Sequence, residues 1–297
     1  MGGAAFILPG LVLILGLSAL FLAGSPPDWI RGAGAGAGAA VAAVAVHAGL
    51  GLVPASWRRA SSRVRWLAYL LAGGAAAATL GPWLVLVLLG CGALELGWQL
   101  RDRLHGVAWP LVAAAAPSSG GLLALAWVAF KVGALSFGGG FVIVPLMRAD
   151  AVDRFHWLTR GQFLNAVALG QITPGPVVQT VAAVGYAAAG VGGGLLAALV
   201  AFSPSFALVL AGAPRFDRLR GNVHARALLE GSGPAAIGAI LGVALPLVRD
   251  LGPAWQYGVL GGAAVLLLAL RRGVVTTLLC AGAAGVIVAL AGGPLPR

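Results

Sequence analysis

Apolar residues run along this chain in long stretches, and short segments between them carry most of the charges. A helix that crosses a bilayer needs about 20 consecutive apolar residues. Stretches of roughly this kind lie at 4–23, 33–54, 66–80, 82–97, 121–147, 161–190, 192–212, 229–249, 254–270 and 273–294. The pattern predicts an all-α polytopic integral membrane protein with about nine to ten apolar helical segments.

Composition and charge support this fold class. Hydrophobic residues make up 60% of the chain and charged residues 9%, whereas a soluble domain averages about 45–50% apolar and about 25% charged. The formal net charge is +11, and the arginines occur in short blocks between apolar stretches. Such blocks are typical of cytoplasmic loops, so we expect the lipid bilayer as a partner and no nucleic acid.

Nothing in the sequence indicates a metal site, a cofactor or an enzyme. Cys91 and Cys280 lie far apart within apolar runs, and the His, Cys, Asp and Glu residues never cluster at metal-ligand spacing. An intramembrane Ser/His protease would need paired residues on facing helices. The candidates are His47 with Ser203, Ser205 or Ser232, and no nucleophile motif surrounds any of them.

The chain divides most plausibly into two parts. The turn signal Gly81-Pro82 predicts a tight helical hairpin from 66–80 and 82–97. The segment 107–120, which ends in Pro-Ser-Ser-Gly, is the expected linker between a region 1–106 and a region 121–297.

Two apolar stretches contain residues that interrupt helices. Stretch 121–147 contains Ser-Phe-Gly-Gly-Gly at 136–140, followed by Pro145, and stretch 161–190 contains Gly-Gln-Ile-Thr-Pro-Gly-Pro at 170–176. A new half-helix after each break would point its free N–H groups and positive dipole end into the bilayer. Transporters use paired broken helices in this way to bind anions, so we expect 121–147 to be re-entrant.

Two charged residues lie near these features. Lys131 is the only lysine, seven residues before Gly138, and an ionisable residue within a span is a candidate functional residue. The alternative is that its ammonium extends to the membrane surface. Glu230 precedes Gly-Ser-Gly-Pro at 231–234 and either carries protons or caps a helix.

The combined motifs resemble the signature half of the chromate transporter family. The resemblance rests on Lys-Val-Gly-Ala-Leu-Ser-Phe-Gly-Gly-Gly at 131–140 with Pro145, Trp-Leu at 157–158 with Phe163, and Gly-Gln-Ile-Thr-Pro-Gly-Pro at 170–176. The Gly-Ser-Gly-Pro segment at 231–234 is similar to the family as well. The resemblance implies a prokaryotic multi-pass inner-membrane protein that exports chromate, with sulfate-like oxyanions as alternatives and protons as the coupling ion.

The expected oxyanion site combines this resemblance with the electrostatics of the two breaks. Lys131 would partly balance the dianion, half-helix N-termini at 138–141 and 176–177 would supply N–H donors, and Gln171 and Thr173 would donate from their side chains. The predicted substrate-binding residues are Lys131, Phe137, Gly138, Gly139, Gly140, Gln171, Thr173, Pro174, Gly175 and Pro176, and the predicted helix-break residues are Pro145, Gly170 and Pro234.

A shift of 195 residues suggests a second, partial copy of this region. It places Gly36 on Gly231 and the apolar run 40–53 on 235–248. The counterpart of 137–140 would then precede Met1, so our hypothesis is that roughly the first 75 residues of a two-half transporter are absent. The arginine-rich segments 55–65 and 213–228 have arginine-poor counterparts, which predicts an inverted repeat with equivalent loops on opposite sides of the membrane.

The sequence therefore predicts a transmembrane exporter of chromate or a similar tetrahedral oxyanion, coupled to the proton gradient and conferring chromate resistance. The alternatives are a sulfate or other oxyanion transporter, an anion channel, and a truncated subunit that does not transport. A homodimer would restore a missing half.

Overall fold

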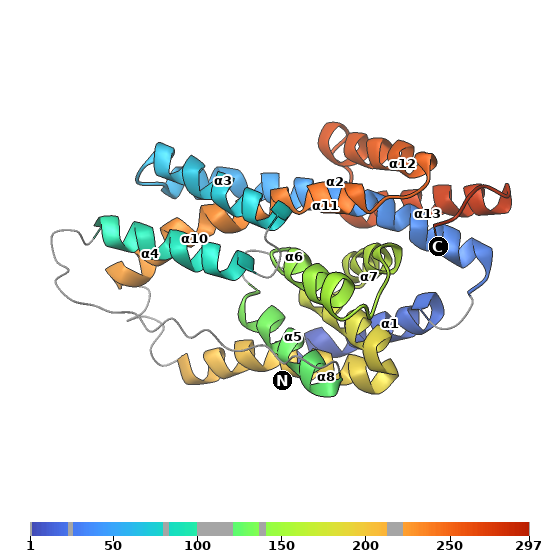
Figure 1. Ribbon diagram of the computed structural model, residues 1–297, viewed down its shortest axis with the longest axis horizontal. Helices are drawn as coiled ribbons and strands as arrows, with labels where there is room; N and C mark the ends of the chain where they lie inside the picture. The colour runs from blue at the N-terminus through green and yellow to red at the C-terminus, as the bar shows by residue number, and fades with distance from the viewer. Residues whose placement is uncertain are drawn as a thin grey trace.

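The protein is a bundle of helices in the computed structural model, which describes residues 2–22, 26–79, 83–99, 121–136, 141–212 and 222–296 (Figure 1). All regular elements within these ranges are helical, which confirms the predicted all-α polytopic class. They are α1 (Gly2–Leu22), α2 (Asp28–Arg59), α3 (Arg63–Thr79), α4 (Leu84–Gln99), α5 (Leu122–Ala134), α6 (Ile143–Arg148), η2 (Ala149–Arg154), α7 (Arg160–Ile172), η3 (Val177–Gln179), α8 (Thr180–Gly212), α10 (Val223–Gly242), α11 (Ala244–Arg249), α12 (Ala254–Ala264), η5 (Val265–Ala269) and α13 (Val274–Leu290).

Four described helical segments are long and apolar enough to cross a membrane. They are Ala5–Leu22, Asp28–Arg59, Val177–Gly212 and Val223–Arg249. Many large apolar side chains on the outer surfaces of the helices are exposed, among them Val12, Leu71 and Leu199. A bilayer provides an apolar environment for such side chains, as expected of a multi-pass membrane protein.

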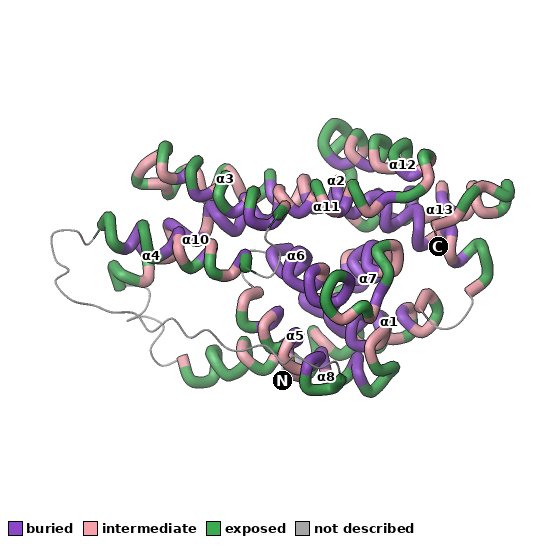
Figure 2. Tube along the Cα trace, in the orientation of Figure 1, coloured by how far each residue is buried: buried purple, intermediate pink, exposed green. Residues whose placement is uncertain are grey.

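The long helix α2 forms the centre of the packing. It contacts α7, α10, α11, α12 and α13, and its residues 35–45 are buried. Figure 2 shows the buried residues concentrated on α2, α6 and α7, with exposed residues on the outer faces of α1, α3, α4 and α12. Helix α7 packs between α2 on one side and α1 and α8 on the other.

Helices α2 and α10 each pack against the helices that follow the other one in the sequence. Helix α2 packs against α12 and α13, whereas α10 packs against α3 and α4, and α2 and α10 contact each other. Small residues allow these close approaches. A Cβ atom on Gly36 would collide with the Ala281 carbonyl of α13, and one on Gly231 would collide with the Cys91 carbonyl of α4. The two glycines are the pair that the 195-residue shift aligns.

Helix α8 consists of two segments that fold back on each other. The backbone leaves helical geometry at Ala189 (φ −155°, ψ 34°) and Gly190 (φ 62°, ψ −155°). A Cβ atom on Gly185 would lie 2.5 Å from the carbonyl oxygen of Gly193, whereas eight residues of straight helix span about 12 Å. The reversal coincides with the predicted boundary between 161–190 and 192–212.

Three residues expected at helix breaks lie inside helices instead. Helix α10 continues through Pro234, and it is packed there against α3 and α4. Pro145 is the third residue of α6, where the missing N–H has no intrahelical acceptor, so it follows a break and does not form one. Gly170 lies within α7 and permits the close approach of Thr180.

Several expectations fall outside the described residues. These are the Gly81-Pro82 turn, the linker 107–120, the glycine segment Phe137, Gly138, Gly139 and Gly140, and the arginines Arg215, Arg218 and Arg220.

Candidate functional site

The first interrupted stretch forms a hairpin of α5 and α6. Helix α5 ends at Ala134, where Leu135 leaves helical geometry (φ −103°, ψ 4°), and α6 begins at Ile143. The side chain of Lys131 forms an ion pair with Asp150 on η2, although the two are 19 residues apart. A straight helix of that length would separate them by about 28 Å. The chain therefore reverses direction between α5 and α6, as predicted for a re-entrant segment.

The Lys131–Asp150 pair is held inside the protein. The side chain of Lys131 is 17% exposed and that of Asp150 is 1% exposed. Buried apolar residues lie on the same helices, namely Val128 and Val132 on α5 and Met147 and Ala151 around Asp150. The ammonium therefore binds a buried carboxylate.

The second interrupted stretch forms a break between α7 and α8. A capping box starts α7: Thr159 Oγ1 accepts from Gln162 N at 3.2 Å, and Gln162 Oε1 accepts from Thr159 N at 2.9 Å. The helix ends at Ile172, and the Pro-Gly-Pro segment passes through Gly175 with φ 138°, a conformation that favours glycine. The single turn η3 then leads into α8. This break lies where the sequence predicted it.

Backbone N–H groups at the start of η3 lack an intrahelical acceptor. Gln179 N bonds to Pro176 O at 2.9 Å, but Val177 and Val178 precede any intrahelical acceptor. Thr173 differs from the prediction in one respect: its hydroxyl donates to Leu169 O at 2.7 Å and is not directed toward a ligand. The Thr173 hydroxyl proton is therefore used within α7, and the N–H groups without an intrahelical acceptor follow Pro176.

Gln171 carries a buried donor without an acceptor. Its Nε2 atom is buried and has no hydrogen-bond partner within the described parts of the chain. A buried unpaired N–H group is costly, and an oxyanion is one kind of acceptor that would satisfy it. The expectation that Gln171 donates to a ligand is compatible with this position.

Helix α1 packs directly on the second break. Gln179, which is 1% exposed, donates from Nε2 to Ile7 O at 2.7 Å. A Cβ atom on Gly10 would collide with the Pro174 carbonyl and the Gln179 amide. The N-terminal helix thus takes part in positioning the Pro-Gly-Pro segment.

A network of ion pairs connects the first hairpin to α11. Arg148 donates from Nε to Asp250 Oδ2 at 2.6 Å and from Nη2 to Oδ1 at 2.8 Å, and it also binds Asp153 at 2.9 Å. The hydrogen bonds to Asp250 raise the pKa of Arg148 above its ordinary value. Arg160 lies 3.6 Å from Asp250. The charged segment after α6 is helical as far as Arg154, and the partners of its charged residues permit their burial.

Residues 123–286 match the model of the chromate transporter family. The chain belongs to the chromate transporter family. Both broken hairpins and the Lys131–Asp150 pair lie within the matched segment.

Relatives within the family include proteins named for chromate transport. The chromate transport protein of Cupriavidus metallidurans is 30% identical over 260 residues, which cover 83% of this chain and 64% of the relative. The probable chromate transport protein of Synechococcus elongatus is 31% identical over 266 residues, covering 84% and 65%. The chromate transport protein of Pseudomonas aeruginosa is 34% identical over 119 residues, covering 40% and 28%.

This chromate transporter family member therefore spans just under two thirds of the length of the first two relatives. No solved structure is significantly similar to the chain.

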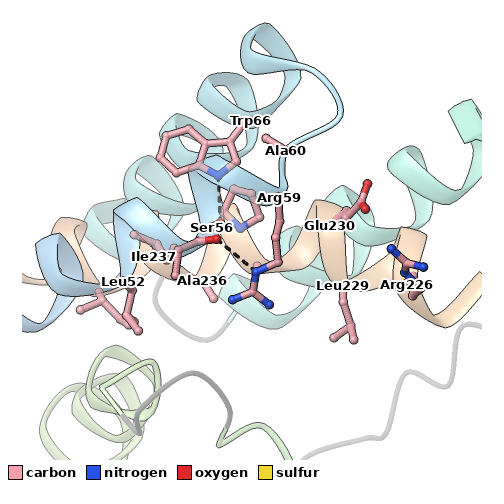
Figure 3. Close-up of a pocket in the computed structure, with 14 residues that line it drawn as sticks. Leu52, Ser56, Arg59, Ala60, Trp66, Arg226, Leu229, Glu230, Ala236 and Ile237 are labelled. Carbon is pink, nitrogen blue, oxygen red and sulfur yellow. Dashed lines mark hydrogen bonds between the residues drawn. The ribbon is translucent and has the colours of Figure 1, made fainter. Parts of the chain in front are cut away.

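A second polar region lies at the arginine-rich end of α2. A cavity of about 430 Å³ opens between α2, α3 and α10 (Figure 3), and its polar lining includes Ser56, Arg59, Trp66, Arg226 and Glu230. Trp66 Nε1 donates to Ser56 Oγ at 2.9 Å, and Arg59 Nε donates to Ala55 O at 3.1 Å (Figure 3). Pro234 also lines this cavity.

Glu95 and Glu230 hold this region together. Glu95 is 2% exposed and accepts hydrogen bonds from Ser61, Arg65, Tyr69 and Gln99. Glu230 accepts from Ser61 Oγ at 3.1 Å and from Gln99 Nε2 at 2.7 Å. Glu230 thus lies within α10 and binds residues before α3 and at the end of α4, so it is not a helix cap.

Sequence reasoning missed three buried acids, Asp150, Glu95 and Asp250. A signal was present, because each is one of only eight acidic residues and lies within or beside an apolar stretch. Their partners lie 19, 30 and 102 residues away in sequence, which spacing alone does not reveal. Among the described residues, no group of three or more His, Cys, Asp or Glu side chains is arranged to hold a metal ion.

Proposed function

We propose that this protein exports chromate, or a similar tetrahedral oxyanion, across the inner membrane and thereby confers chromate resistance. The observation that carries the proposal is the pair of broken helical hairpins, one of which holds the single lysine of the chain. Family membership and relatives named as chromate transport proteins support the substrate class.

The chemistry of the breaks suits a dianion with four acceptor oxygens. The proposed site takes N–H donors from the glycine segment 138–141 and from Val177 and Val178, and a side-chain donor from Gln171. Helix N-termini add partial positive charge, and Lys131 adds a full positive charge when it is released from Asp150. Thr173 contributes through its position before Pro174, since its hydroxyl proton is bonded to Leu169.

The proton gradient supplies the proposed driving force. Its electrical component, negative inside, favours the exit of an anion by about 2.3 kcal/mol per charge per 100 mV. Alternating access would come from rocking of two inverted repeats against each other. Each rocking body would contain helices from both 1–106 and 121–297, because α2 packs against α12 and α13 whereas α10 packs against α3 and α4.

A homodimer is part of the proposal. The relatives that the chain matches are longer, and a second copy would supply a further set of broken hairpins. The rival interpretation is a subunit that does not transport by itself. Such a subunit would bind a different chain and would carry no chromate flux alone. A channel is the other rival, and it would show non-saturating conductance.

Chromate flux in inverted vesicles tests the proposal. Vesicles from cells expressing the chain should take up chromate faster than vesicles from cells without it, and sulfate should compete. Absence of flux above the control at a confirmed level of membrane-inserted protein would contradict transport by this chain.

Lys131→Ala should abolish this flux, because the dianion loses its balancing charge. The double variant Lys131→Ala with Asp150→Asn serves as the matched control for folding, since it leaves no unpaired carboxylate buried. Both variants should lose at least about 90% of the flux, equivalent to about 1.4 kcal/mol or more of transition-state stabilisation. Normal flux in the double variant would remove Lys131 from the site.

A further inference from the structure

Within the described part of the chain, the Asp150 carboxylate is paired with Lys131. The side chain of Asp150 is 1% exposed, and its ion pair and its side-chain hydrogen bond there are both with Lys131 Nζ. The backbone around Asp150 forms a turn of π-helix, Ala149–Arg154. This form is rare in proteins, and where it occurs it is often at a functional site. The pair is neutral as a unit, which permits its burial.

Other charged groups near Asp150 already have partners or are directed elsewhere. Arg148, two residues before it, forms two hydrogen bonds to Asp250 and one to Asp153. Arg154 lies over the Phe155 ring, and His156 Nδ1 lies 2.7 Å from Val152 O. The titratable and charged groups on the elements that surround η2 are Lys131 of α5, Arg148 of α6, Asp153 and Arg154 of η2, His156 after it, Arg160 of α7 and Asp250 after α11.

An oxyanion that binds Lys131 therefore competes with Asp150. When the ammonium turns to the oxyanion, the Asp150 carboxylate remains at a buried position without a cation of its own. An unpaired buried carboxylate is strongly unfavourable, and such a group gains a proton in preference to remaining charged. The proton converts the carboxylate to a neutral carboxylic acid, and its release on oxyanion departure restores the ion pair.

We propose that Asp150 is a proton-binding counter-ion of the oxyanion site, which yields Lys131 to the substrate and takes up one proton as it does so. This inference rests on the proposed function. It adds to the proposed function the residue that binds the coupling proton and the direction in which that proton crosses the membrane. Because the proton and the oxyanion occupy the site together, they cross the membrane in the same direction.

The direction is compatible with export. A dianion that leaves with one proton carries one net negative charge outward, and the potential that is negative inside favours this movement. The pH difference opposes it, so the electrical component must dominate. An antiporter would instead bind the proton only when the oxyanion has left.

The test measures proton movement during chromate flux by purified protein in liposomes, in mildly alkaline, weakly buffered solution where free chromate is the dianion. Wild-type protein should move one proton with each chromate, in the same direction. The number of protons moved per chromate should fall toward zero in Asp150→Asn, whatever chromate flux that variant retains. Asp150→Glu, which keeps the acid, should keep the wild-type ratio of protons to chromate.

Asp153→Asn is the matched control. Asp153 lies on the same π-helical turn but is 51% exposed and binds Arg148, so its removal should leave the proton stoichiometry unchanged. Proton movement that persists undiminished in Asp150→Asn, or proton movement opposite to chromate in the wild type, would overturn the inference while leaving transport intact.

A second measurement covers the case in which Asp150→Asn does not fold. Chromate added to unbuffered wild-type protein in detergent should cause uptake of one proton per oxyanion bound, and no proton uptake on binding would overturn the inference. Absence of both binding and flux in the wild type would instead contradict the proposed function.

Discussion

Arg148 shows how single side chains in this protein join distant parts of the chain. Its two hydrogen bonds to Asp250 connect the end of α6 with the residue after α11, although the two positions lie 102 residues apart. The fork of the guanidinium matches the two carboxylate oxygens, a geometry that a lysine ammonium does not reproduce. The end of α6 is thus fixed to the residue that follows α11.

Arg148→Lys should destabilise the protein, because one of the two hydrogen bonds to the buried Asp250 carboxylate is lost. The expected loss is about 2 kcal/mol, the typical value of a hydrogen bond to a charged group. Thermal unfolding in detergent should show a lower midpoint temperature. Arg160→Lys, at a side chain that is 66% exposed and 3.6 Å from Asp250, should leave the midpoint nearly unchanged. Equal midpoints for the two variants would contradict this role of Arg148.

At the scale of residues, the sequence identified a notable side chain where its place within an apolar stretch was itself unusual. Lys131 stood out because a lysine within an apolar stretch is costly. Its partner did not, because Asp150 approaches Lys131 only after the chain reverses at a segment whose geometry the sequence leaves open. The role of Gln171 as a donor remains a prediction, and its Nε2 atom is buried without a partner among the described residues. The Thr173 hydroxyl, also predicted as a donor to a ligand, donates to Leu169 O instead.

At the scale of elements, close packing through glycine is the main feature. Helix α10 approaches α3 so closely that a Cβ atom on Gly238 would collide with the Leu70 carbonyl and lie 2.9 Å from Gly74 N. A Cβ atom on Gly233, one and a half turns earlier on the same helix, would meet nothing within 4 Å. Substituting alanine at both positions therefore distinguishes the effect of a steric collision from the effect of alanine's higher helix propensity.

Gly238→Ala should lower the stability of the protein by about 1–3 kcal/mol, the usual cost of overpacking a filled interface. Gly233→Ala should be neutral or slightly stabilising, because alanine favours helix and nothing is displaced. Unfolding midpoints of both variants in the same detergent provide the comparison. A Gly238→Ala protein as stable as the wild type would show that α10 and α3 are not in direct contact.

The breaks illustrate what patterns of helix-breaking residues can and cannot predict. Gly-Gly-Gly and Pro-Gly-Pro occur where two helices end, and both interruptions were located from the sequence. Pro234 lies among similar residues, yet α10 continues through it. The difference arises from tertiary packing: α10 is packed between α3 and α4, which hold the helix in place around the proline.

At the scale of the whole molecule, the partner exchange of α2 and α10 is the organising feature. The helical class and most of the apolar segments followed from the hydrophobic pattern, because membrane helices must be long and apolar. The exchange did not follow, since contacts between distant helices depend on their order in space. The alignment of Gly36 with Gly231 was the one sequence feature related to it.

Chromate uptake by liposomes that contain only the purified chain tests the central claim most directly. We expect uptake that saturates with chromate concentration, is inhibited by sulfate and is lost in the Lys131→Ala/Asp150→Asn variant. Uptake no faster than in protein-free liposomes, by a chain shown to be folded and inserted, would contradict the assignment of this protein as an oxyanion transporter.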